Sequence, residues 1–321
     1  MNKTSIFFLS LCAALLMSAC SWVDDDLSKC PKGNWLKLSY TYNLLDVDAV
    51  ATQVENVTLF VYKHDGTLVH REEVDSVNLH GNGCKIRIPD LPEGDYDFLV
   101  WGGLDDSNYK YTPDSVELLC NEHNENSAKL KSLFHGRLDN IHITDDYNVY
   151  ELYLSKLTNV FSCMFQSESD SLLAIQNDLR VEIASKNSCI DHRNNIIGDK
   201  QIYYLPFMKE TSTIEDLDVF HVGLNTLRLM EKDNTRFRLI YVPTGQKIID
   251  IPLTDYILFS RHVDYASMPP QEYLDREDHY NLIFLLTESV KPEDPPLICA
   301  QVNINGWIVR YEDVDLEHSG N

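Results

Sequence analysis

Short segments in which apolar and polar residues alternate recur along this chain, and they constrain its fold more than any other feature. Residues 35–42 alternate in this way, and residues 84–89 repeat the pattern. A turn at Pro92, Glu93 and Gly94 then leads into a further strand-like segment, residues 95–102. Short strands about every 8 to 12 residues, with turn signals between them, are typical of antiparallel sheets rather than of βαβ units. The sequence therefore predicts an all-β chain that folds into antiparallel β-sandwiches.

One hairpin is marked by the residues of its turn. Residues 57–62 and 68–69 are rich in β-branched and aromatic side chains, and His64, Asp65 and Gly66 separate them. An Asp-Gly pair supplies the positive φ angles that a tight primed turn requires. We expect Asp65 and Gly66 to form such a turn.

The chain is long enough for two domains. Residues 1–19 have the pattern of a signal peptide, and their removal leaves about 300 residues, more than one core usually organises. The stretch 105–148 is polar with few regular periods, and strand patterns resume at residues 150–154 and 160–165. We expect an N-terminal β-sandwich at residues 34–148 and a C-terminal β-sandwich at residues 149–321.

The C-terminal half carries three more local predictions. Residues 169–179 form a partial apolar helical face that Ser171 is placed to cap. Residues 280–286 are apolar on both faces, which is typical of a central strand. The last strand is expected at residues 298–311, with Asn305 and Gly306 kinking or bulging it.

The N-terminus has the features of a lipoprotein signal. Lys3 precedes an apolar run of 12 residues, 6–17, which is too short to cross a bilayer, and Ser18 and Ala19 lie directly before Cys20. Residues 16–20 resemble a lipobox, although Met17 stands where Leu is usual. We expect cleavage before Cys20, lipidation of Cys20, and stable attachment to the membrane through several acyl chains. The alternative is an ordinary signal peptide followed by a chance cysteine.

Residues 20–33 form the tether between this lipid and the first domain. Asp24, Asp25 and Asp26 resemble the acidic run that sends some lipoproteins to the cell surface. A plain solvated linker is the alternative, because a short acidic run is a weak signal by itself.

The charge of the chain excludes some partners. It has 27 basic and 50 acidic residues, a formal charge of −23. A surface of this sign repels phosphate, so nucleic acid is not an expected partner and membrane attachment has to come from the lipid.

The cysteines beyond Cys20 are scattered and contain no C-x-x-C pair. Six of them allow 15 pairings in an exported protein, and the sequence does not choose among these. We expect mostly buried free thiols with at most one disulfide among Cys30, Cys84, Cys120, Cys163, Cys189 and Cys299.

The motifs of common catalytic and metal sites are absent from the sequence. There is no G-x-S-x-G elbow, no H-E-x-x-H pair and no glycine-rich phosphate loop. The histidines show no spacing typical of a metal site, and Asp46 and Asp48 lack the glycine and distal glutamate of an EF-hand loop. The sequence predicts no enzyme activity, no cofactor and no metal.

Several segments, taken in order, resemble the FimB-like family of fimbrial anchor lipoproteins of type V pili. Beyond the lipobox and acidic run, the resemblance rests on residues 40–42, 57–62, 94–98 with 101–102, 154–159, 204–206, 278–280 and 304–307. It covers nearly the whole chain, and it implies two transthyretin-like β-sandwich domains in tandem. Within these segments we expect Tyr96, Phe98 and Trp101 to be core residues rather than ligand contacts.

The resemblance implies a structural function. The chain is expected to be a lipid-tethered subunit at the base of a fimbria, on the outer face of the outer membrane, where it holds a stalk subunit (fimbrillin) and limits fimbrial length. The alternative is a surface lipoprotein whose sandwiches bind glycan or a host protein.

Strand addition is the expected mode of attachment. Stalk subunits of the family open a groove by losing an N-terminal strand, and a lipid-bound subunit that lost this strand would lose its anchor. We therefore expect this chain to donate a strand. The candidate is residues 308–316, in which Ile308, Val314 and Leu316 share one face and Arg310 and Glu312 interrupt it. A terminal strand followed by a frayed polar tail is the alternative.

Overall fold

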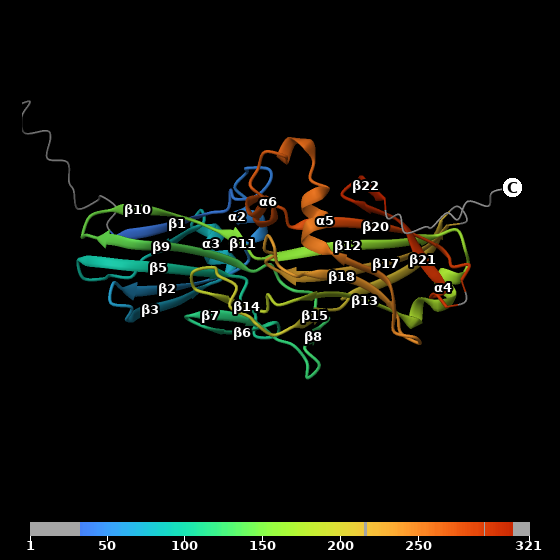
Figure 1. The fold of residues 1–321 in the computed structure, drawn as a ribbon. Helices are drawn as coiled ribbons and strands as arrows, with labels where there is room; N and C mark the ends of the chain where they lie inside the picture. The colour runs from blue at the N-terminus through green and yellow to red at the C-terminus, as the bar shows by residue number, and fades with distance from the viewer. Residues whose placement is uncertain (1–32, 215–216, 292, 311–321) are drawn as a thin grey trace, which may run out of the picture.

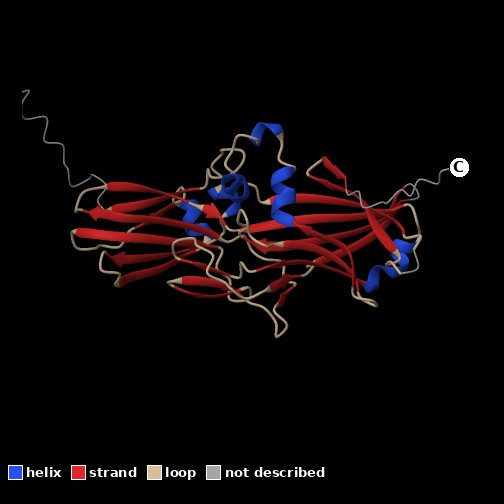
Figure 2. Cartoon of the chain, viewed as in Figure 1, coloured by secondary structure: helices blue, strands red, loops and turns tan. Residues whose placement is uncertain are grey.

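The computed structural model describes residues 33–214, 217–291 and 293–310. In this part of the chain four of the five β-sheets build two sandwiches, which lie end to end in an elongated molecule (Figure 1). Strands dominate both ends, whereas the short helices gather where the sandwiches meet and at one end (Figure 2). The prediction of an all-β chain with two sandwiches in tandem is confirmed.

The first sandwich packs a three-stranded sheet against a five-stranded sheet. The three-stranded sheet has the order β10 (Asn148–Tyr153), β1 (Asn34–Ser39), β4 (Lys85–Arg87). The five-stranded sheet has the order β11 (Ser155–Lys156), β9 (Phe134–Ile143), β5 (Gly94–Gly102), β2 (Val57–Lys63), β3 (Leu68–Val74). Their inner faces share one apolar core, to which β1 contributes Leu36 and Leu38 and β5 contributes Tyr96 and Phe98.

The second sandwich is larger. One sheet has the order β16 (Met208–Ile214), β17 (Leu217–Leu227), β12 (Thr158–Ser167), β20 (His279–Glu288), β21 (Leu297–Ile304), β22 (Trp307–Arg310). The other has the order β19 (Gln246–Pro252), β18 (Arg236–Tyr241), β13 (Leu179–Ser185), β15 (Ile202–Tyr204), β8 (Glu125–Asn126). Between them Phe284 stacks on Phe165 and on Phe237, with ring centroids 5.2 and 4.9 Å apart, so aromatic packing joins the two sheets.

The fifth sheet is small and links the two sandwiches. It has the order β14 (Cys189–Asp191), β7 (Ser115–Leu118), β6 (Tyr109–Thr112). Tyr109, Val116 and Ile190 of this sheet belong to the same apolar cluster as the second core, and so do Leu99 and Trp101 of β5. The second core therefore continues onto the outer face of the first sandwich.

The helices are short and lie between strands. They are α2 (Val50–Gln53), α3 (Ser76–Gly81), α4 (Ser171–Ile175), α5 (Leu253–Phe259) and α6 (Pro270–Arg276), with 3₁₀ turns η3 (Gln176–Asp178) and η4 (Val263–Tyr265). In the expected helix 169–179, only α4 and η3 form. Ser171 is its first residue rather than its cap, since Asp170 holds the N-cap position and its side chain makes no capping hydrogen bond.

Strand pairing suggests a different division from the one expected at residue 148. β10 pairs with β1 along its whole length, and β11 pairs with β9, so both complete the first sandwich. β7 and β8 come earlier in the chain but pair with β14 and β15. We propose that the sandwiches divide after Lys156, with residues 109–126 crossing over to the second.

Most strand pairs are antiparallel, as the turn signals indicated. Three described pairs are parallel: β1 with β10, β12 with β20, and β15 with β8. Each of these pairs joins two segments that are far apart in sequence. No turn signal between them therefore predicts the pairing. β20 is central, but its outer residues Ile283 and Leu285 are half-buried rather than covered.

Two turns differ from the sequence predictions. In the β2–β3 hairpin only Gly66 has a positive φ, of 84°, and the register shifts between Val61 and Tyr62. That hairpin therefore has a bulge rather than a two-residue primed turn. Residues 298–311 do not form one kinked strand, because Asn305 (φ 48°) and Gly306 (φ 88°) reverse the chain between β21 and β22.

Candidate attachment and docking surfaces

The first described strand is built into the core of its sandwich. β1 begins at the outer end of the molecule (Figure 1) and pairs with β10 on one edge and β4 on the other. Leu36 and Leu38 are 0% exposed, and the Asn34 side chain donates to the Thr144 carbonyl at 2.9 Å. Burying each leucine stabilises the fold by about 1.5–3 kcal/mol. The predicted lipidation site Cys20 and the acidic run Asp24, Asp25 and Asp26 lie outside the described residues.

The last described strand is held on one side only. β22 ends its sheet and pairs with β21, with Ile308 opposite Asn303. The strand runs along the second sandwich, the one farther from β1 (Figure 1). Ile308, a predicted donor residue, is thus in an edge strand, whereas Val314 and Leu316 lie outside the described residues.

The turn before β22 is tied to the centre of the sheet. The Asn305 backbone N–H donates to the Asn281 carbonyl at 2.8 Å, and the Asn281 N–H donates to Asn305 Oδ1 at 2.9 Å. Asn and Gly are the residues that adopt positive φ at lowest cost, which explains the tight reversal here. The turn is therefore fixed, and the strand after it is the part with a free edge.

A buried ion pair joins the two sandwiches. Lys156 of β11 has a side chain only 6% exposed, and its Nζ donates to Asp278 Oδ2 and, at 3.1 Å, to Gln53 Oε1 of α2. Asp278 Oδ1 lies 2.6 Å from His279 Nδ1. Burial alone would raise the pKa of Asp278, but hydrogen bonds from His279 and Lys156 hold it below its ordinary value. Asp278 is therefore a carboxylate that ties the start of β20 to β11.

Arg276 makes a second tie at the same place. It comes from α6, and its Nη1 donates to Asp46 Oδ1 at 2.6 Å while its Nε donates to Glu272 at 2.8 Å. Its guanidinium lies 4.5 Å from the centre of the Tyr42 ring. We call this region, where α2, β11, α6 and the start of β20 meet, the junction.

The junction gathers segments on which the family resemblance rests. Residues 40–42, 154–159 and 278–280 are far apart in sequence but supply Tyr42, Lys156 and Asp278 to this one place. From the sequence, these segments were interpreted as residues of the core and of turns. Their convergence was missed, because no spacing connects residues more than 100 positions apart.

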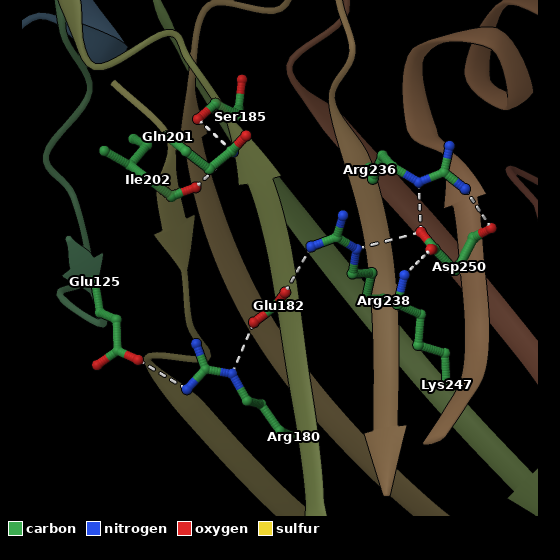
Figure 3. A network of polar contacts seen from close by, with 10 residues as sticks. All are labelled: Glu125, Arg180, Glu182, Ser185, Gln201, Ile202, Arg236, Arg238, Lys247 and Asp250. Carbon is green, nitrogen blue, oxygen red and sulfur yellow. Dashed lines mark hydrogen bonds and ion pairs between the residues drawn. The ribbon is translucent and has the colours of Figure 1, made fainter. Parts of the chain in front are cut away.

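A ladder of charges crosses the outer face of the second sandwich (Figure 3). Glu182 of β13 accepts from Arg180 at 2.7 Å and from Arg238 at 3.2 Å, and Arg180 also donates to Glu125 of β8. Arg238 reaches Asp250 of β19, which accepts from Lys247 and Arg236 as well. Arg180 lies between Glu125 and Glu182, and Arg238 lies between Glu182 and Asp250, so these ion pairs join β8, β13, β18 and β19. The ladder is therefore a contact between strands, in which every charged group already has a partner.

Three sequence predictions about chemistry can be compared with the described residues. Cys84, Cys120, Cys163, Cys189 and Cys299 are free thiols, and of these only Cys163 is buried. No group of three metal-ligating side chains occurs among the described residues. Tyr96, Phe98 and Trp101 are buried in the core, as expected. In the same part of the chain no helix is long and apolar enough to cross a membrane.

The comparisons with known proteins agree with this fold. A family model described as fimbrillin-A associated anchor proteins Mfa1 and Mfa2 matches residues 27–313. No curated protein matches the chain.

Solved structures of similar fold cover almost the whole described chain. A candidate adhesin from Bacteroides thetaiotaomicron is 28% identical with a TM-score of 0.73, covering 88% of this chain and 98% of that chain. A candidate polysaccharide-binding protein from the same organism is 26% identical with a TM-score of 0.73, covering 87% and 98%. The fimbrial anchor protein Mfa2 from Porphyromonas gingivalis is 18% identical with a TM-score of 0.68, covering 88% and 99%, a likeness of fold.

Proposed function

Since this chain belongs to the family of fimbrillin-A associated anchor proteins Mfa1 and Mfa2, we propose that it is the lipid-tethered base subunit of a fimbria. The family gives it a fimbrial anchor or adhesin role at the cell surface. In the finer proposal, lipid on Cys20 holds it to the outer membrane and its C-terminal segment holds a stalk subunit by strand addition.

One observation carries this proposal: the opposite ways in which the two described ends are held. β1 follows the tether directly and is paired on both edges. A force on the tether therefore acts on a strand that its two neighbours and the core hold in place. β22 has one free edge and leads into residues 311–321. A strand held on one side can exchange its partner for the edge of another sandwich.

Deleting residues 312–321 tests strand donation. The truncated lipoprotein should remain folded and surface-exposed but should release its fimbriae into the medium. Fimbriae in the medium and on the cells are then measured with an antibody. Normal retention by the truncated chain would rule out donation by this tail.

The two N-terminal predictions have their own tests. Cys20→Ala should abolish incorporation of a labelled fatty acid, and equal labelling of variant and wild type would contradict lipidation there. Replacing Asp24, Asp25 and Asp26 with Ala should leave the protein lipidated but protect it from protease added to whole cells. Digestion as fast as that of the wild type would mean that the run is only a linker.

Length control follows from the same arrangement. A subunit that cannot release its own N-terminal strand offers no groove to a further subunit, so its incorporation ends growth. Cells that lack the chain should carry or shed longer fimbriae in electron micrographs. An unchanged length distribution would remove this part of the proposal.

A second candidate function is the binding of glycan or host protein. It is favoured by the neighbour described as a candidate polysaccharide-binding protein, 26% identical over most of both chains. A glycan array probed with the purified protein tests it directly. Selective binding there, together with normal fimbrial retention in cells that lack the chain, would favour this function over anchoring.

A further inference from the structure

A groove lies at the junction, between the loop after β1 and the start of β20. Its main cavity has a volume of about 600 Å³, within the range of about 300–1,000 Å³ that is usual for ligand pockets. A second cavity of about 310 Å³ adjoins it, and Tyr265 and Glu277 line both. The groove therefore runs from the 43–49 loop to the Asn305–Gly306 turn.

Two carboxylates in this groove have no cation within ion-pair distance in the described part of the chain. Glu277 Oε1 accepts only from the backbone N–H groups of Asp278 and His279, both at 3.1 Å. Asp48 accepts from the backbone N–H groups of Tyr40 and Val50 and from the Ser39 hydroxyl.

The other charged groups at the junction are already paired. Asp278 pairs with Lys156, and Arg276 pairs with Asp46 and Glu272. Burial and the neighbouring Asp278 charge raise the pKa of Glu277 more than His279 and the two backbone hydrogen bonds lower it. The groove therefore carries uncompensated negative charge.

Part of the wall and part of the rim of the groove are apolar. Tyr40, Leu44, Ala49 and Tyr265 line the cavity. On the rim Leu45 is 80% exposed and Val47 61% exposed, and across the groove Val263, on the turn that carries Tyr265, is 68% exposed. Exposed apolar residues around a concave site are typical of a surface that binds a protein.

We propose that the junction groove receives a lysine or arginine side chain from the fimbrial subunit that this anchor holds. Such a side chain has an apolar stem that suits the tyrosine and leucine walls and a cationic head that suits Glu277 and Asp48. The occupant is an organic cation rather than a metal ion, because the described residues contain no three-ligand metal cluster. The inference rests on the proposed anchoring function and adds a second contact to strand donation.

The test measures binding of the full-length lipoprotein, in neutral detergent, to fimbriae sheared from cells that lack it. Glu277→Gln keeps the size of the side chain and removes its charge, and it should weaken binding about tenfold, as the loss of one charge pair at an interface does. Glu277→Lys places a competing cation in the groove and should weaken binding more. Glu117→Lys is the matched control, because Glu117 is an exposed residue of β7, on the side of the molecule opposite α2 and α6 (Figure 1), and its change of charge is the same. The control should bind like the wild type.

Thermal unfolding of each variant separates a binding effect from a folding effect. If Glu277→Lys does not fold, Glu277→Gln decides. Wild-type affinity in every folded Glu277 variant would overturn the proposal, and so would equal weakening by Glu117→Lys.

A photo-crosslinking residue in place of Val47 gives an independent readout. The crosslinked fimbrial peptide, identified by mass spectrometry, should contain lysine or arginine close to the crosslink. A peptide without either residue, or a crosslink to another segment of this same chain, would contradict the proposal.

The two contacts can fail separately. Lost retention after deletion of residues 312–321, with unchanged binding by the Glu277 variants, overturns the groove contact alone. The reverse result overturns strand donation alone.

Discussion

β1 and β22 are the strands nearest the two ends of the described chain, and they differ in how they are held. β1 has a partner strand on each edge and inward leucines without exposure, whereas β22 has one partner and four residues. A strand with two partners leaves only when its sandwich opens, but an edge strand can leave alone. The difference fits the proposed anchor, in which one end stays in place while the other exchanges its partner strand.

The largest expected effect comes from weakening β1. Leu38→Ala should lower the free energy of unfolding by about 2–5 kcal/mol, because it leaves a cavity at a fully buried leucine. Urea unfolding measures the loss. A chain that ends at Gly306, and so lacks β22, should lose less than half as much stability. Equal losses would mean that the two strands are held alike.

Acid gives a second way to weaken the sandwich that holds β1. Burial lowers the pKa of His135, on β9, to about 4, although its Nε2–H donates to the His192 carbonyl at 2.9 Å. The unfolded chain takes up this proton as pH falls through about 6.5, whereas the folded chain does not until about pH 4. The contribution of His135 is therefore fully present above pH 6.5 and falls by about 1.4 kcal/mol per pH unit between 6.5 and 4.

His135→Gln should remove this dependence, because glutamine keeps a donor for the His192 carbonyl but does not titrate. The free energy of unfolding of the variant and of the wild type is compared at pH 7 and pH 5. The pH dependence assigned to His135 is the difference between the wild-type and variant curves. Other groups also change the free energy of unfolding with pH: burial raises the pKa of Glu277, and its contribution to stability therefore increases as the pH falls. Parallel curves for the two proteins would contradict the assignment to His135.

The same comparison shows where sequence reasoning succeeds. β1 alternates, whereas β2 and β5 are rich in β-branched and aromatic residues, and turn residues follow β2 and precede β5. Their existence and the burial of Tyr96, Phe98 and Trp101 therefore follow from local pattern. β22 was expected as the end of one long strand that bulges at Asn305 and Gly306. An Asn-Gly pair is compatible with either a bulge or a chain reversal, and the local sequence does not show that the chain turns back to pair with β21.

Other elements were missed for physical reasons that can be stated. β6 and β7 bury few residues each, notably Tyr109, Val116 and Leu118, so their short pattern is lost in a polar stretch. α6 did carry a signal, because Pro270 stands at its first position and Arg276 in its last turn. The junction groove had no signal, since its carboxylates Asp48 and Glu277 come from opposite halves of the chain.

The turn that leads to β22 offers a smaller perturbation. Gly306 has a φ of 88° and open space around its Cβ position, so Gly306→Ala adds backbone strain without a clash. That strain is about 1 kcal/mol, which should make β22 open about fivefold more often. Hydrogen exchange of the β21 and β22 amides measures the opening, and β1 amides should not change.

Gly81→Ala is the matched control for this turn. Gly81 lies in α3, also has open space around its Cβ position, and does not have a positive φ. It should leave exchange in β22 unchanged. If Gly306→Ala also leaves β22 unchanged, the turn does not control the release of that strand.

The smallest expected effect concerns the ion pair on β1 itself. Lys37 Nζ lies 3.0 Å from Glu151 Oε1, and the two side chains are 42% and 41% exposed. The hydrogen bond between them raises the pKa of Lys37 and lowers that of Glu151, but both groups stay in water, where such pairs add little to stability. Lys37→Met should therefore leave the urea midpoint unchanged at both low and high salt. A loss of stability close to that of Leu38→Ala would show that charge holds β1 in place, rather than apolar burial and hydrogen bonding to two strands. The attachment of β1 to its sheet would then weaken as ionic strength rises.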